Sequence, residues 1–132
     1  MAAQTPNQEK PTKTVIIIDD SQFMRQKLKQ IVLGLGYTVL AEGETGVDAV
    51  KLFAEHSPDL ITLDIVMPLM NGVVALTAIK KAAPTARVIM ISSFGEETYV
   101  RLAALAGAEN FILKPFDEKQ VALVLQASLG PN

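Results

Sequence analysis

The sequence has no cysteine, no long apolar run and no excess of positive charge. Without cysteine, the chain can form neither disulfide bonds nor thiolate metal sites. The aliphatic run Val15–Ile18 is far too short for a membrane span or the core of a signal peptide. Twelve Lys and Arg against fourteen Asp and Glu give a net charge of −2, whereas a nucleic-acid module needs a basic face. We therefore expect a soluble, cytoplasmic protein that binds neither membranes nor nucleic acid.

The length and composition indicate one globular domain. The chain has 132 residues, 49% of them hydrophobic, which suffices for a sizeable core. Residues 1–14 are polar, contain two prolines and show no apolar periodicity, so we predict a flexible leader there. The predicted domain spans residues 15–132.

Two kinds of apolar pattern alternate along the domain. Short, continuous apolar runs predict buried strands at 15–18, 38–41, 60–63, 88–91 and 111–113. Apolar residues at helical spacing predict helices around 24–35, 47–54, 76–83, 100–104 and 117–128. Asp117 and Gln120 have the spacing of a capping box before the last helix. This alternation predicts an α/β fold with a five-stranded parallel sheet, doubly wound as (βα)5 and flavodoxin-like.

Polar residues follow four of the five predicted strands. The first strand is followed by Asp19 and Asp20, the third by Asp64, the fourth by Ser92 and the fifth by Lys114. In doubly wound sheets the functional site lies beyond the carboxyl ends of the strands, where the strand order reverses. We therefore expect three carboxylates, a hydroxyl and an ammonium group at one edge of the sheet.

Such a group of side chains indicates phosphoryl chemistry assisted by a metal ion. Three neighbouring carboxylates repel one another, and Mg²⁺, which prefers oxygen ligands and also binds phosphate oxygens, would relieve the repulsion. Lys114 offers a compact positive charge for a phosphoryl oxygen, and Ser92 offers a hydroxyl donor. Each residue has a structural alternative, for example Asp20 as a helix cap or Asp64 as a turn residue. Their joint position at one edge favours the site.

Four segments carry a resemblance to a known family. They are IIIDDSQFMR (16–25), LDIVMPLMNG (63–72), VIMISS (88–93) and GAENFILKPF (107–116). From Val15 to about Leu129 the chain resembles a response-regulator receiver domain, closest to stand-alone chemotaxis regulators of the CheY type. The resemblance implies the strand order 2-1-3-4-5 of that family.

The resemblance also implies roles for the polar residues at the strand ends. Asp64 would accept a phosphoryl group from a phosphohistidine on a CheA-like sensor histidine kinase. Asp20, Asp64 and the backbone carbonyl of Val66 would ligate Mg²⁺, with Asp19 acting through a metal-bound water. Lys114 would pair with the phosphoryl oxygens, and its bond to the following proline is usually cis. The protein would be a signalling switch, not an enzyme, that catalyses its own phosphorylation and dephosphorylation.

The switch itself is assigned by resemblance to Ser92 and Phe111. Phosphorylation of Asp64 would pull Ser92 inward, and Phe111 would fill the space that it leaves. The changed surface would lie on the fourth and fifth helices and the fifth strand, around Val100, Ala104, Phe111 and Leu113. A phosphorylation-dependent output protein would bind there, in this family a flagellar motor switch protein, and we expect the chain itself to be a monomer.

Two departures from the family concern the rim of the site. Val66 and Phe94 occupy positions that are often polar, and neither side chain can orient a water molecule by hydrogen bonding. Phe94 is also large enough to shield the path of attack. We therefore predict a long-lived phosphoryl group on Asp64.

Three alternative functions fit part of this pattern. A receiver domain of a longer transcription regulator often dimerises through charged pairs on its last helices, but here the last helix has no Arg and only Lys119. A dehalogenase-type phosphatase needs Asp-x-Asp after the first strand and a cap domain, whereas Asp19 and Asp20 are adjacent. A binding module with an inactive site would not need all five polar residues at the strand ends.

Overall fold

The computed structural model of the chain describes residues 12–130. Most of the predicted leader therefore lies outside the described residues. Its last residue, Thr14, already belongs to the first strand, β1 (Thr14–Ile18). The backbone N–H of Thr14 donates to Asp59 at 2.8 Å, and its hydroxyl donates to the same carboxylate at 3.0 Å.

Five parallel strands form one sheet in the order β2-β1-β3-β4-β5, which confirms the predicted fold and strand order. The other strands are β2 (Thr38–Gly43), β3 (Leu60–Asp64), β4 (Val88–Ser92) and β5 (Asn110–Leu113). Each strand is longer than its apolar run. Asp64 still pairs with Ile91, and Ser92 with Leu113, because backbone pairing does not depend on an apolar side chain.

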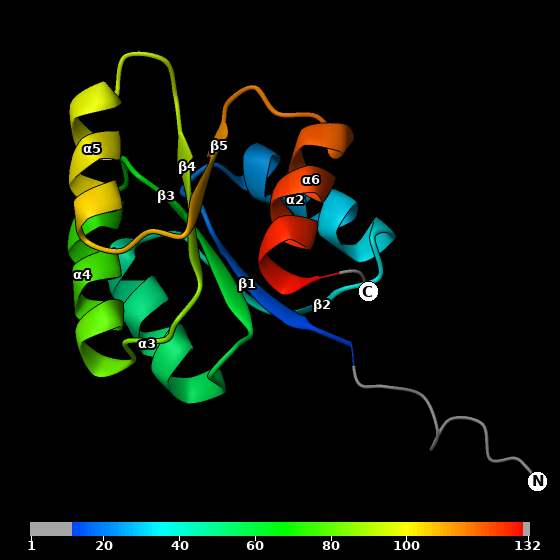
Figure 1. Ribbon diagram of the computed structural model, residues 1–132, viewed down its shortest axis with the longest axis horizontal. Coiled ribbons are helices and arrows are strands. Elements are labelled where there is room, and N and C mark those ends of the chain that lie inside the picture. The colour runs from blue at the N-terminus through cyan, green and yellow to red at the C-terminus, as the bar shows by residue number, and fades with distance from the viewer. Residues whose placement is uncertain (1–11, 131–132) are drawn as a thin grey trace, which may run out of the picture.

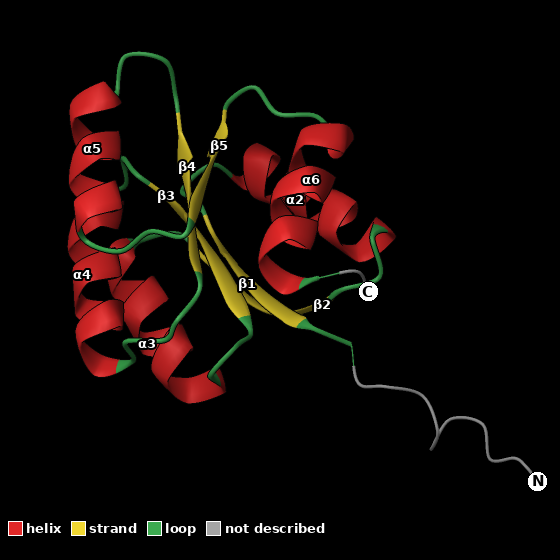
Figure 2. Ribbon diagram, in the orientation of Figure 1, coloured by secondary structure: helices red, strands yellow, loops and turns green. Residues whose placement is uncertain are grey.

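Five described helices cover the sheet in two layers. They are α2 (Gln22–Gly34), α3 (Gly46–His56), α4 (Gly72–Ala82), α5 (Glu97–Leu105) and α6 (Glu118–Leu129). Helices α2 and α6 lie on one face, and α3, α4 and α5 lie on the other (Figures 1 and 2). Among residues 12–130, no helix is long and apolar enough to cross a membrane.

The core consists of two apolar clusters separated by the sheet. One contains Ile17 of β1 with Leu28 of α2 and Leu125 of α6. The other contains Ile16 of β1 with Leu76 of α4. Successive residues of β1 thus face opposite layers, as the continuous apolar run of a doubly covered strand predicts.

Side-chain caps fix where four of the five described helices begin, and only α5 lacks such a cap. Ser21 accepts from the backbone N–H of Met24 and so caps α2, which excludes the alternative in which Asp20 is the cap. The predicted cap of the last helix is confirmed, since Asp117 accepts from the N–H of Gln120 at 2.8 Å. Each helix therefore begins just beyond a loop at the carboxyl edge of the sheet.

Candidate functional site

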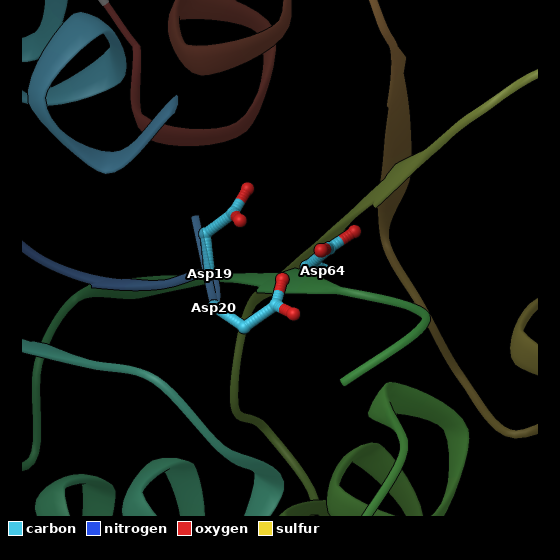
Figure 3. Close-up of side chains that lie close together, drawn as sticks. All are labelled: Asp19, Asp20 and Asp64. Carbon is cyan, nitrogen blue, oxygen red and sulfur yellow. The ribbon is translucent and has the colours of Figure 1, made fainter. Parts of the chain in front are cut away.

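Three carboxylates meet at the carboxyl edge of the two central strands. Asp19 and Asp20 follow β1, and Asp64 ends the neighbouring strand β3. One carboxylate oxygen from each residue lies within 4.8 Å of the others. Figure 3 shows the three side chains converging from these two segments. Asp19 and Asp64 are buried, whereas Asp20 is exposed.

The ammonium group of Lys114, just beyond β5, joins this cluster. Its Nζ lies 2.9 Å from Oδ2 of Asp19 and 3.3 Å from Oδ2 of Asp64. The backbone N–H of Lys114 donates to the carbonyl of Ser92 at 2.7 Å, and the peptide bond to Pro115 is cis. The structure thus brings together the carboxylates and the ammonium group expected at this edge.

The cluster holds more negative charge than its surroundings neutralise. The pKa of Asp64 is raised to about 7, chiefly by burial and next by the charge of Asp19, while Lys114 opposes the shift. Burial alone would lower the pKa of Lys114, but its hydrogen bond to Asp19 and the charge of Asp64 outweigh burial and raise it. A bound cation would favour the ionised carboxylate and so oppose both the burial and the repulsion that raise the pKa of Asp64.

The oxygen atoms of the cluster suit Mg²⁺, and they are not equally available. Both carboxylate oxygens of Asp19 are engaged, Oδ1 by the N–H of Ser21 at 2.9 Å and Oδ2 by Lys114. Within the described residues the Asp20 carboxylate makes no hydrogen bond or ion pair, and the Asp64 carboxylate is paired only with Lys114, through Oδ2. Hard oxygen ligands of this kind are those that Mg²⁺ prefers. Asp20 and Asp64 therefore have the oxygens free for a metal ion.

The remaining predicted residues lie at the ends of β3 and β4 and on β5. Ser92 ends β4 and is buried, and Phe111 of β5 is half-buried against the cluster that contains α4. Val66 lies in the loop after Asp64 with half of its surface exposed. Phe94 is 91% exposed in the loop after β4, so no packing holds it over the site, and its predicted shielding stays a prediction.

Two residues against the site were missed by the sequence reasoning. Arg25 donates from Nη1 to the carbonyl oxygen of Asp19 at 2.7 Å. Gly72, the first residue of α4, lies against the backbone of Asp64 and donates its N–H to Ile65 at 2.7 Å. Their signals were a charged residue one turn into a helix and a glycine at a helix start, which are common for other reasons.

Comparisons with known proteins agree with this geometry. Residues 15–126 match the family model for the response regulator receiver domain. The chemotaxis protein CheY of Bacillus subtilis is 44% identical over 116 residues, covering 88% of this chain and 97% of that protein. CheY of Thermotoga maritima is 43% identical over 113 residues, covering 86% and 94%.

The fold is also similar to that of solved structures. A chain in the crystal structure of the CheX–CheY–BeF3–Mg²⁺ complex from Borrelia burgdorferi superposes with a TM-score of 0.83. It is 37% identical, and the alignment covers 87% of each chain. Family match, identity and fold lead to one conclusion: the chain belongs to the response regulator receiver-domain family, as a receiver of the CheY type.

Proposed function

We propose that this receiver accepts a phosphoryl group on Asp64 from a phosphohistidine of a sensor histidine kinase. The nitrogen–phosphorus bond of the donor breaks with its electron pair left on the imidazole, and a carboxylate oxygen of Asp64 forms the new bond to phosphorus. The observation that carries the proposal is the position of Asp64, buried, within 3.3 Å of Lys114 and beside two further carboxylates. Phosphoryl transfer needs mainly such positioning and charge stabilisation.

The other site residues then have distinct roles. Lys114 pairs with the oxygens of the incoming phosphoryl group, releasing part of its contact with Asp64. Asp20, Asp64 and the carbonyl of Val66 hold Mg²⁺, and Asp19 acts through a water molecule. When bound, the ion neutralises negative charge on the phosphoryl oxygens. The engagement of both Asp19 oxygens by protein groups supports this division between Asp19 and Asp20.

We further propose that the charge on Asp64 is read through Ser92 and Phe111. Ser92 moves toward the phosphoryl group, and Phe111 packs further inward. The output surface lies on α5, β5 and α6, around Val100, Ala104, Phe111 and Leu113. Large apolar side chains exposed on α5 and β5 support this assignment, since they suit a protein partner; they are Tyr99, Leu102, Leu105 and Leu113.

The biological setting follows from the relatives. Several relatives are chemotaxis proteins, and one similar chain comes from a complex of CheY with CheX. We propose a cytoplasmic, monomeric chemotaxis regulator with a CheA-like kinase as donor. Its phosphorylated form would bind an output protein of the flagellar motor switch kind.

A labelling experiment tests the assignment of Asp64. The wild type, Asp64→Asn, Asp20→Asn and the control Asp48→Asn would be incubated with radiolabelled acetyl phosphate and Mg²⁺. Only the wild type and Asp48→Asn should carry label, because Asp20→Asn removes a metal ligand while Asp48 lies on α3 outside the cluster. Labelling of Asp64→Asn at the wild-type level would disprove the proposal.

A further inference from the structure

The guanidinium group of Arg25 lies directly behind the loop that carries the acidic residues. It projects from α2, and only 13% of the side chain is exposed. Its Nη1 donates to the carbonyl oxygen of Asp19 at 2.7 Å, while its Nε lies 3.6 Å from Oε1 of Glu42 on β2. Arg25 thus connects the first helix and the edge strand to the peptide group of one site residue.

Asp19 is held on every side by groups of the protein. Its backbone N–H donates to the carbonyl of Gly43 at 3.1 Å, and its carbonyl accepts from Arg25. Its two carboxylate oxygens accept from the N–H of Ser21 and from Lys114. Of these contacts, the one from Arg25 alone fixes the carbonyl, and that carbonyl belongs to the peptide group that leads into Asp20. Within the described residues the side chain of Asp20 makes no hydrogen bond or ion pair. The position of Asp20 therefore depends on how the peptide group between Asp19 and Asp20 is held.

Arg25 also places a positive charge on the protein side of the carboxylate cluster. A guanidinium group stays charged at every physiological pH, and its planar geometry lets it bind two acceptors in fixed directions. The charge strengthens the hydrogen bond to the Asp19 carbonyl beyond that of a neutral donor. Lys29 does not share this role, because its Nζ lies 2.8 Å from Oε2 of Glu42 and contacts no residue of the cluster.

We propose that Arg25 is a positioning residue that orders the Asp19–Asp20 loop for binding a divalent cation. Arg25 touches neither the cation nor the phosphoryl group and acts through the backbone of Asp19. The inference rests on the proposed function only in the identity of the cation, since the contact itself is present in the protein alone. Outer contacts of this kind commonly contribute about tenfold or more to metal affinity.

Calorimetric titration of the phosphate-free protein with Mg²⁺ tests the inference without any measurement of phosphorylation. Arg25→Ala should weaken Mg²⁺ binding about tenfold. Arg25→Lys should restore part of the loss, because one ammonium group can reach only one of the two acceptors. Lys29 lies on the same helix as Arg25 and pairs with the same Glu42. The Mg²⁺ affinity of Lys29→Ala should therefore stay within about twofold of the wild-type affinity.

A second measurement separates positioning from a general loss of stability. Val32→Ala truncates a buried residue of the same helix and serves as a destabilised control. In amide hydrogen exchange, Arg25→Ala should speed exchange at the amides of Asp19 and Ser21. In Val32→Ala these two amides should exchange no faster than the lower global stability of that variant accounts for. Unchanged Mg²⁺ affinity in Arg25→Ala, or equal weakening in Val32→Ala, would overturn the inference.

The two proposals can fail separately. If the wild type binds Mg²⁺ with the predicted dependence on Arg25 but takes no label on Asp64, the proposed function is wrong and the role of Arg25 stands. If Asp64 is labelled normally and Arg25→Ala binds Mg²⁺ as the wild type does, the role of Arg25 is wrong and the proposed function stands.

Discussion

The α-carbon of Gly72 lies so close to the carbonyl oxygen of Asp64 that a Cβ atom at Gly72 would overlap it. The same Cβ atom would lie 3.0 Å from the α-carbon of Ile65. Both neighbours are backbone atoms of the segment that carries the proposed phosphoacceptor Asp64, so neither can rotate away as a side chain would. The start of α4 therefore packs directly against the backbone of Asp64 and Ile65.

We predict that Gly72→Ala displaces the segment around Asp64. The variant should lose at least about 2 kcal/mol of unfolding free energy, because the overlap is with backbone atoms. It should also take up label from acetyl phosphate more slowly than the wild type at saturating Mg²⁺. Urea denaturation and the labelling assay measure the two effects.

Gly34→Ala is the matched control for that variant. Gly34 ends α2, and beyond its chain neighbours and its own helix backbone no described atom lies within 4 Å of a Cβ placed there. The substitution should be neutral or stabilising by up to about 1 kcal/mol, because alanine favours the helix over glycine. Gly72→Ala with the same stability as Gly34→Ala would contradict the close packing at Asp64.

The stability of the metal-free protein should depend on pH through Asp64. Burial raises its pKa from 3.8 to about 7 in the folded state, so between these values the folded state binds more protons than the unfolded state. Stability therefore falls as pH rises through this window, and the loss is complete above pH 7, at most about 4 kcal/mol. Asp64→Asn removes the titrating group and should be more stable than the wild type at pH 8.

Thermal unfolding at several pH values checks this prediction. The gain from Asp64→Asn should shrink toward pH 4 and vanish near pH 3, where the carboxyl group is protonated in both states. The exposed Asp20 offers the control Asp20→Asn, whose gain at pH 8 should be much smaller. Added Mg²⁺ should stabilise the wild type and not Asp64→Asn, since a ligand bound only by the native state stabilises it. A gain from Asp64→Asn of equal size at pH 4 and pH 8 would refute the assignment.

Thr62 carries a hydroxyl group that is buried without a hydrogen-bond partner in the described part of the chain. Replacement by valine keeps the shape of the side chain. It also removes a hydroxyl group that loses its bound water on folding and gains no hydrogen bond in return. We predict that Thr62→Val raises the unfolding free energy by about 1 kcal/mol. Thr14→Val should have the opposite effect of similar size, because that hydroxyl donates to Asp59 at 3.0 Å and accepts from its N–H at 2.9 Å. Chemical denaturation of both variants provides the comparison.

The lifetime of the phosphoryl group should respond to the two apolar residues at the rim. Hydrolysis needs a water molecule held in line with the bond between Asp64 and phosphorus. Neither Val66 nor Phe94 can hold it, and both are exposed, so substitution there spares the core. Val66→Asn, Phe94→Glu and the double variant should lose phosphate faster than the wild type at fixed Mg²⁺. Equal or slower rates would show that water is oriented elsewhere.

The order of the elements and the residues at the strand ends could be predicted from the sequence, because both depend on local patterns. An apolar run that is followed by Asp64 or Ser92 indicates a strand and its carboxyl end, and this pattern can be recognised without knowledge of the tertiary contacts. The role of Arg25 could not be predicted in this way. Its acceptors are a backbone carbonyl at the end of one strand and Glu42 on another, and no periodicity reports which carbonyl a side chain will meet. The exposure of Phe94 depends likewise on the path of a loop.

The pairing of β1 with β3, and of β4 with β5, has a consequence for the newly made chain. Asp19 and Asp64 are brought together only by a crossover, and Lys114 arrives with the last strand of the sheet. No fragment of the chain that ends before Lys114 contains the complete cluster. A chain that has formed only the units before β5 therefore lacks the ammonium group of the proposed site. That site is completed only when the last strand joins the sheet, so acceptance of a phosphoryl group would report a completed sheet.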